Sequence, residues 1–166
     1  WEYYENLYPE RDLDEKAIVT RYAPSPTGFV HLGALYAAFI ARKMAKQSNG
    51  VFFLRIEDTD QKRSIEDGVK KIITDLANFD ITFDEGVTLE GDKGNYGPYT
   101  QSERGDIYKV FAKKLIIEDK AYPCFCSSES LQEDRERQEK HKERIGYYGY
   151  YARCRNLSME EALEKI

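Results

Sequence analysis

The sequence lacks the features of several classes of protein. Its 166 residues contain only three cysteines, an odd number that argues against a disulfide framework. No apolar run is long enough to span a bilayer, and the stretch Trp1 to Asp14 is polar and acidic, unlike a signal peptide. Internal repeats and low-complexity tracts are absent too. These absences predict a soluble cytoplasmic protein that does not use a membrane.

An excess of positive charge is also missing. The formal net charge is -5, with 33% charged and 41% hydrophobic residues. This balance argues against a protein that holds nucleic acid by bulk electrostatics, so any RNA contact must use local patches. Basic residues do gather over 135–144, but glutamates alternate with them, and a solvated helix is the simpler interpretation.

Hydrophobic spacing predicts alternating strands and helices. Short β-branched or apolar runs predict strands at 17–20, at 51–56 and around Phe83. Apolar residues at helical spacing predict helices from Leu32 to a stop at Gly50, over 65–79 with a cap at Ser64 and Asp67, and over 107–116. A glycine-rich loop is expected at 86–98. The alternation predicts an α/β fold with a Rossmann-like parallel sheet that binds ligands at the carboxyl ends of its strands.

The character of the chain changes at Ala121. Cysteines appear, a charged helix is predicted over 129–144, and tyrosines cluster at 147–151. We therefore expect an N-terminal extension at 1–16, the first half of an α/β domain at 17–120, and the start of an inserted subdomain at 121–166.

The loop that follows the first predicted strand has the chemistry of a phosphate site. It contains prolines and Gly28, and it leads directly into a helix N-terminus, where free N–H groups and a partial positive charge favour an anion. His31 can donate to a phosphoryl oxygen, and Gly33 lets a planar base approach the backbone. For the His-x-Gly pair alone, a proline-rich turn with a surface histidine is the simpler interpretation.

Five ordered strings point to a family. They are the loop from Arg21 to Ala34, Arg55-Ile-Glu-Asp-Thr-Asp60, Phe83-Asp-Glu-Gly86, Gln101-Ser-Glu-Arg104 and Ala121-Tyr-Pro-Cys124. In this order they resemble the signatures of class I aminoacyl-tRNA synthetases. Ala23-Pro-Ser-Pro-Thr-Gly28, within the first string, is similar to the glutamate-specific form.

This resemblance implies a glutamate–tRNA ligase. Such an enzyme joins glutamate to the α-phosphorus of ATP, with Mg²⁺, and then moves the glutamyl group to the terminal ribose of tRNA. The expected partners are glutamate, ATP and tRNA, and the expected full-length form is a monomer. A lysine-rich loop that the family places later is missing here, so this chain is expected to be an N-terminal portion that is inactive alone.

The resemblance also assigns residues. Its ATP-binding positions are Thr27, His31, Gly33 and Ala34, of which His31 and Gly33 are the catalytic candidates and Ala34 replaces the family's second histidine. In its glutamate pocket Arg21 faces the side-chain carboxylate, Glu57 faces the α-ammonium, and Ala23 and Ser25 line the wall. These charges suit the substrate, because a carboxylate pairs best with a planar cationic fork. A structural ion pair between Arg21 and Glu57 is an equally good interpretation of the pattern alone.

The three cysteines suggest a metal. Cys124, Cys126 and Cys154 provide three of the four ligands of a structural zinc site. By resemblance to family members with a zinc-bearing insertion, Tyr150 is the expected fourth ligand, since Asn156 is a poor one. The alternative is a small core of three reduced cysteines.

Two other functions fit the strings. One is a shorter synthetase-like enzyme that glutamylates a modified base of tRNA. The other is a non-catalytic domain that binds ATP or RNA, which the missing lysine-rich loop would permit.

Overall fold

The computed structural model describes residues 1–28, 30–60 and 62–165. It divides the chain into two compact units, Trp1–Lys109 and Val110–Ile166, so the division falls ahead of the change of character predicted at residue 121. Phe29, within the predicted phosphate loop, and Ile166, at the end of the predicted insertion, lie outside the described residues, as does Gln61.

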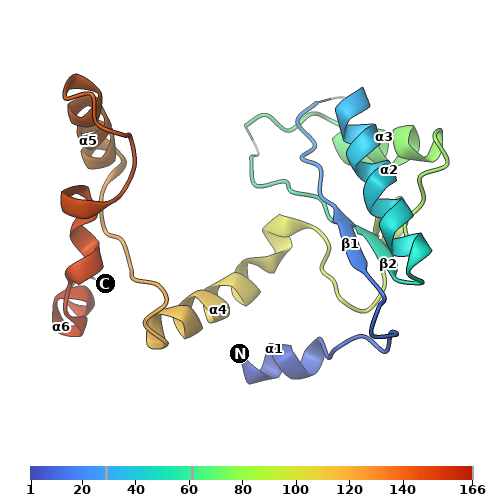
Figure 1. Cartoon of the computed structure of the whole chain (residues 1–166), viewed down its shortest axis with the longest axis horizontal. Coiled ribbons are helices and arrows are strands. Elements are labelled where there is room, and N and C mark those ends of the chain that lie inside the picture. Colours follow the sequence, from blue (N-terminus) through green and yellow to red (C-terminus); the bar gives the residue numbers. More distant parts are fainter. Residues whose placement is uncertain (29, 61, 166) are drawn as a thin grey trace. The chain divides into compact units, whose positions relative to one another are not determined.

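The first unit contains a four-stranded sheet (Figure 1). Strands β1 (Val19–Tyr22), β2 (Val51–Leu54) and β3 (Glu85–Thr88) are parallel, as predicted, and are adjacent in that order. The third strand is predicted around Phe83, but it begins at Glu85 and includes Gly86, which lies in the predicted loop. Strand β4 (Gly91–Lys93) pairs antiparallel with β3, which corrects the prediction of a wholly parallel sheet and of an irregular glycine-rich loop. The hairpin turns between Thr88 and Gly91, and Gly91 has a φ of 119°, in the region that favours glycine.

Two helices cover one face of this sheet. Helices α2 (Leu32–Gln47) and α3 (Gly68–Ala77) connect the parallel strands and, in Figure 1, lie on the same side of them. Their buried side chains pack with Phe52 of β2 into the core cluster, which comprises Ala38, Ala45, Phe52, Ile72, Leu76 and Ile81. Small alanines on α2 allow the helix to approach the strands closely. The resulting core supports the strand ends from which the loops start.

The ends of these helices depend on backbone contacts. Helix α2 ends at Gln47, and Gly50 shortly after it must be a glycine because a Cβ there would lie 2.0 Å from the carbonyl oxygen of Ile18. The predicted cap of α3 was wrong. Asp67 is the N-cap residue, but it has a φ of 55° and its side chain makes no capping hydrogen bond.

The N-terminal segment packs on the opposite face of the sheet. Its short helix α1 (Glu2–Leu7) is followed by Tyr8, whose hydroxyl donates to the carbonyl of Gly97. Arg11 forms a two-point ion pair with Glu85 of β3, with Nη2 2.7 Å from Oε2, and its guanidinium lies 3.8 Å from the ring centroid of Tyr96. Charge-assisted two-point pairs are the strong kind, so the segment is tied to the sheet.

Tyr99 completes this polar cluster. It is 2% exposed, and its hydroxyl donates to Glu85 Oε2 at 2.8 Å. The hydrogen bond from Arg11 is the main reason that the pKa of Glu85 is lowered. Burial, with the same carboxylate nearby, raises the pKa of Tyr99 to about 12. Glu85 is therefore ionised and Tyr99 neutral at pH 7.

The second unit is helical. Helix α4 (Gly105–Ile117) leads into it after the 3-10 turn Gln101–Arg104, and α5 (Ser128–Lys140) and α6 (Met159–Leu163) follow. Helix α5 begins where Ser127 Oγ accepts a hydrogen bond from the Ser130 N–H, and it ends before the predicted limit at residue 144. Within the described ranges, no helix has the length and apolarity that crossing a membrane would require.

We predict that Arg11→Ala lowers the free energy of unfolding by about 2 kcal/mol near pH 7, between the values for exposed and buried ion pairs. The pKa of Glu85 is lowered in the folded state, so the stabilisation is present above its usual value of 4.5 and disappears as the pH falls through the folded value. Urea unfolding of both proteins at neutral and acidic pH measures this. Lys109→Ala, which breaks an exposed pair with Asp106, serves as the control and should cost at most about 0.5 kcal/mol. An undiminished difference at low pH would contradict the prediction.

Candidate functional site

The loop after β1 is held by backbone bonds to two neighbouring segments. The N–H of Glu57 donates to the carbonyl of Pro24 at 2.9 Å, and the N–H of Ile65 donates to that of Pro26 at 2.9 Å. A Cβ on Gly68 would lie 2.9 Å from the Pro26 carbonyl oxygen, so the loop lies against the start of α3. The proline-rich string is thereby fixed next to the string that contains Glu57.

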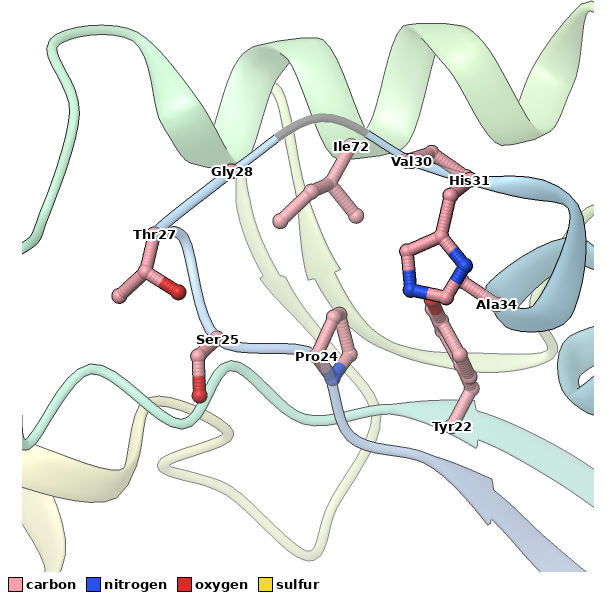
Figure 2. A pocket seen from close by; sticks show the side chains of 9 residues that line it. All are labelled: Tyr22, Pro24, Ser25, Thr27, Gly28, Val30, His31, Ala34 and Ile72. Atoms are coloured by element: carbon pink, nitrogen blue, oxygen red, sulfur yellow. The ribbon is translucent and has the colours of Figure 1, made fainter.

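This loop encloses a cavity of about 260 Å³. Figure 2 shows Ser25 and Thr27 on one side of it, His31 and Tyr22 on the other, and Ile72 pointing in from α3. The residues that line it are Tyr22, Pro24, Ser25, Thr27, Gly28, Val30, His31, Ala34 and Ile72. Polar groups at the rim and an apolar floor are typical of a small-molecule site.

His31 sits at the entrance to helix α2. It is the N-cap residue with extended backbone, and its side chain makes no capping hydrogen bond. Its imidazole ring instead lies over the first turn, since a Cβ on Gly33 would be 3.2 Å from His31 Cε1. The ring therefore stands beside the N–H groups of the first helical turn, and the first turn carries no acidic residue. Both features favour an anion at this helix end.

A charged cluster lies at the ends of β1 and β2. Arg55 Nη2 is 2.7 Å from Glu57 Oε1, and Arg21 Nη2 is 3.9 Å from the same oxygen. Side chains alternate along a strand, and Arg21 pairs in register with Phe53, so Arg21 and Arg55 point to the sheet face opposite Tyr22. The structure thus brings Arg21 and Glu57 together, but neither lines the cavity around His31.

The predicted site residues are divided accordingly. Ser25, Thr27, His31 and Ala34 line one cavity, whereas Gly33 lies under the His31 ring. Ala23 lies on the same loop, between Tyr22 and Pro24, and is partly buried. The loop after β1 and the string that contains Glu57 therefore converge at the carboxyl ends of β1 and β2.

Two of the other strings are joined by direct contacts. Asp58 accepts hydrogen bonds from the N–H and the hydroxyl of Ser102, the first at 2.9 Å. Ile56 and Thr100 form a parallel bridge, in which the Ile56 N–H donates to the Tyr99 carbonyl at 3.0 Å. This pairing connects the acidic string after β2 to the start of α4.

The cysteines of the second unit form a cluster that could hold a metal ion. The sulfur atoms of Cys124, Cys126 and Cys154 all lie within 4.8 Å of one another. Cys126 Sγ and Cys154 Sγ are 3.7 Å apart, close to the roughly 3.8 Å that two thiolates 2.3 Å from a tetrahedral zinc would have. The Phe125 N–H donates to Cys154 Sγ, and this bond is the main cause that lowers the pKa of the thiol to about 7. A thiolate, the form that binds metal, is thus favoured at Cys154. At Cys126 the Tyr147 hydrogen bond lowers the pKa, but burial and the neighbouring thiols raise it by more.

The hydroxyl of Tyr147 contacts two of these thiols. Its oxygen is 3.3 Å from Cys124 Sγ and 3.5 Å from Cys126 Sγ. The same contacts raise the pKa of the Tyr147 phenol. Tyr150, the predicted fourth ligand, is 76% exposed and packs edge-on against Tyr151. Its role as a ligand stays a prediction.

Comparison with known proteins identifies the family. The profile described as tRNA synthetases class I (E and Q), catalytic domain, matches residues 17–166. The chain belongs to this synthetase family. The family predicted from the five strings is therefore confirmed.

Relatives of this synthetase chain are similar over nearly all of it. The glutamate–tRNA ligase of Clostridium beijerinckii is 54% identical over 166 residues, covering 99% of this chain and 30% of the relative. The glutamate–tRNA ligase of Acetivibrio thermocellus is 54% identical over 165 residues, with the same shares. The chain thus spans about 30% of the length of the curated relatives it matches.

A solved structure has the same fold as the synthetase chain. It is a glutamate tRNA ligase from Elizabethkingia meningosepticum in complex with its amino acid, with a TM-score of 0.76 and 36% identity. The similarity covers 90% of this chain and 30% of that one. The mixed, mostly parallel sheet with its helices is accordingly like a class I synthetase catalytic domain.

Three residues of the candidate site are not among those that the sequence predicts for it. Tyr22 lines the cavity. The available signal was strand alternation, which places Tyr22 on the face opposite Arg21. Ile72 falls within the helix predicted over 65–79, and only the tertiary structure shows that its side chain also lines the cavity. Arg55 belongs to the second string, and its position two residues before Glu57 in extended chain was the available signal for their contact.

Gly33→Ala should separate stability from nucleotide binding. The new Cβ would lie 3.2 to 3.3 Å from the His31 ring and displace it, whereas alanine favours a helix over glycine by up to about 1 kcal/mol. We expect an unfolding midpoint no lower than that of the parent and about tenfold weaker ATP binding by calorimetry in the full-length natural protein. Gly105→Ala, at a helix position with open space, is the control and should leave ATP affinity unchanged. Unaltered affinity in Gly33→Ala would refute this role for the glycine.

Proposed function

We propose that this chain carries the glutamate-activating site of a cytoplasmic, monomeric glutamate–tRNA ligase. The observation that carries the proposal is the convergence of two groups of residues at the ends of β1 and β2. One group is the loop and helix end at His31, and the other is the Arg21 and Glu57 pair. Relatives at 54% identity with that name support it.

The proposed roles follow from charge. Glutamate needs a cationic fork for its side-chain carboxylate and an anion for its ammonium, and Arg21 and Glu57 supply one each. Arg21 is 42% exposed and its contact with Glu57 is long, 3.9 Å, so both groups remain accessible to a ligand. Ser25 and Ala23, which lie on the loop after β1, would line the wall of the glutamate pocket.

The nucleotide would bind at the entrance to α2. ATP with Mg²⁺ would place its phosphates near His31 and the first-turn N–H groups, with Thr27 and Ala34 lining the cavity and Gly33 beneath the ring. The glutamate carboxylate then attacks the α-phosphorus and pyrophosphate leaves. Charge grows on phosphate oxygens in this step, and donors already in position stabilise it. The activated glutamyl group finally moves to tRNA.

Replacing His31 tests this function. In the full-length natural protein, glutamate-dependent exchange of pyrophosphate into ATP, measured with and without tRNA, should fall by about 100- to 1,000-fold in His31→Ala, since a positioned donor to the developing charge is lost. His141→Ala is the matched control, because the second histidine lies in the other unit at the end of α5. The 166-residue chain alone should be inactive.

Two results would overturn the proposal. One is a full-length protein that exchanges pyrophosphate with no dependence on glutamate. The other is full activity in His31→Ala.

We further propose that the cysteine cluster holds a structural zinc ion. Cys124, Cys126 and Cys154 would supply three thiolates, and their spacing fits a tetrahedral shell. For the fourth position we favour Tyr147 over Tyr150, because the Tyr147 hydroxyl already lies on two of the sulfurs. Bound zinc would tie the segment after α4 to the turn before α6.

Metal analysis separates the two tyrosines. The purified chain should contain about one zinc per molecule. Cys154→Ser should lose the metal, and Tyr147→Phe should weaken zinc affinity at least about tenfold in a chelator competition, as the loss of a supporting ligand does. Tyr150→Phe should keep the parent affinity. The reverse order of the two tyrosine variants would restore Tyr150 as the ligand, and a metal-free, stably folded parent would refute the zinc proposal.

A further inference from the structure

Arg55 holds the carboxylate that the proposed function assigns to the substrate ammonium. Its Nη2 donates to Glu57 Oε1 at 2.7 Å, a charge-assisted hydrogen bond of ordinary strong geometry. The same oxygen is 3.9 Å from Arg21 Nη2, near the limit of an ion pair. Of the two guanidiniums beside Glu57, Arg55 is the less exposed, at 19% against 42%.

The backbone keeps Arg55 and Glu57 on one side of the sheet. They are two residues apart in extended chain, so both side chains project to the same face. The N–H of Arg55 donates to the Tyr22 carbonyl at 3.0 Å, and that of Glu57 donates to the Pro24 carbonyl at 2.9 Å. These bonds continue the β1–β2 pairing past the end of the strands, and they hold Arg55 in reach of Glu57.

An Arg21–Glu57 pair without Arg55 would obstruct the site. Arg21 in β1 and Glu57 after the neighbouring strand β2 have opposite charges, and at hydrogen-bond distance they would neutralise each other. Glutamate would then have to break that pair before either group could bind it. Because Arg55 is 1.2 Å closer to the shared oxygen than Arg21 is, Glu57 is drawn away and the Arg21 guanidinium stays open.

The charges of the three residues also match one substrate better than its closest analogue. Two guanidiniums and one carboxylate sum to a net +1, and free glutamate at neutral pH carries a net -1, whereas glutamine is net neutral. Without Arg55 the remaining pair sums to zero and fits glutamine equally well. The Nε of Arg55 is buried and has no hydrogen-bond partner among the described residues, so the Nη2 bond to Glu57 is the side-chain hydrogen bond that orients this guanidinium.

We propose that Arg55 is a positioning and specificity residue of the glutamate site: it orients Glu57, keeps Arg21 open for the substrate carboxylate and supplies the charge that favours glutamate over glutamine. This inference rests on the proposed function of the chain. Arg55 acts on the amino acid through Glu57 and through its charge, and it has no part in the phosphate chemistry at His31.

The test uses Arg55→Gln and Arg55→Lys in the full-length natural protein, with pyrophosphate exchange in the presence of tRNA. Arg55→Gln should raise the KM for glutamate about 10- to 100-fold, the effect of losing a charged partner in a binding site. The KM for ATP should change less than about twofold, because the nucleotide cavity lies on the other face. The ratio of the inhibition constant of glutamine to the KM for glutamate should fall. Arg55→Lys keeps the charge without the planar fork of the guanidinium. Its KM for glutamate should lie between the values for the parent and for Arg55→Gln.

A double-mutant cycle shows whether Arg55 acts through Glu57. Glutamate affinity is measured by calorimetry for Arg55→Gln, Glu57→Gln and the double variant. If Arg55 positions Glu57, the Arg55→Gln change should cost much less affinity when Glu57 is already replaced. Equal costs in both backgrounds would overturn the positioning role.

The outcomes distinguish this inference from the proposed function. A parent enzyme without glutamate-dependent exchange defeats the proposed function itself. If the parent is active and Arg55→Gln has an unchanged KM for glutamate, only the inference is defeated. The inference is also defeated if the KM values for glutamate and ATP rise equally in Arg55→Gln and its unfolding midpoint falls. Should Arg55→Gln fail to fold, Arg55→Lys still decides, because a KM for glutamate equal to the parent's in that variant contradicts the need for the fork. Lys109→Gln, which removes an exposed ion pair, is the control and should match the parent throughout.

Discussion

The parallel pairing of β1 with β2 is the constraint on which the site depends. Tyr22 is in register with Leu54, and the pairing continues beyond both strands through the bonds from Arg55 to Tyr22 and from Glu57 to Pro24. Because parallel strands end at the same edge of a sheet, this register brings the proline-rich loop and the acidic string together. A shift of one residue would turn every side chain of the strand to the other face.

The same alternation separates the two halves of the proposed chemistry. Tyr22 faces the helices and the cavity next to His31, whereas Arg21, one residue earlier, faces the other side with Arg55 and Glu57. Nucleotide groups and amino-acid groups can thus approach from different faces and meet beyond the strand ends, where the glutamate carboxylate must reach the α-phosphorus. The N-terminal segment lies on the face that carries Glu85 and Tyr99, although it precedes the residues that match the family profile.

Buried polar groups in this protein are satisfied in pairs. Glu85 has Arg11 and Tyr99, Asp58 has Ser102, and Gln138, only 1% exposed, both donates to and accepts from the backbone of Gly146. Such pairing is required because an unpaired buried polar group costs roughly 1–3 kcal/mol. Among the described residues, the Nε atoms of Arg55 and Arg104 are exceptions, since both are buried without a hydrogen-bond partner, and the first lies beside the proposed glutamate site.

The sequence by itself determined the alternation of the main strands and helices, the approximate positions of β1 and β2, and the family. It did so because periodicity and ordered motifs are local properties: the apolar run 51–56 and the string around His31 can be recognised without knowing their neighbours. Strand β4 was not predicted, because a short strand that begins with a glycine at positive φ looks like a loop in the sequence. The tertiary structure alone decided which distant groups meet. That Arg21 stays 3.9 Å from Glu57, that Tyr147 contacts the cysteines, and that Arg11 pairs with Glu85 are contacts set by strand register and loop packing, which no local pattern encodes. The Arg55–Glu57 contact, in contrast, joins two residues that are close in the sequence.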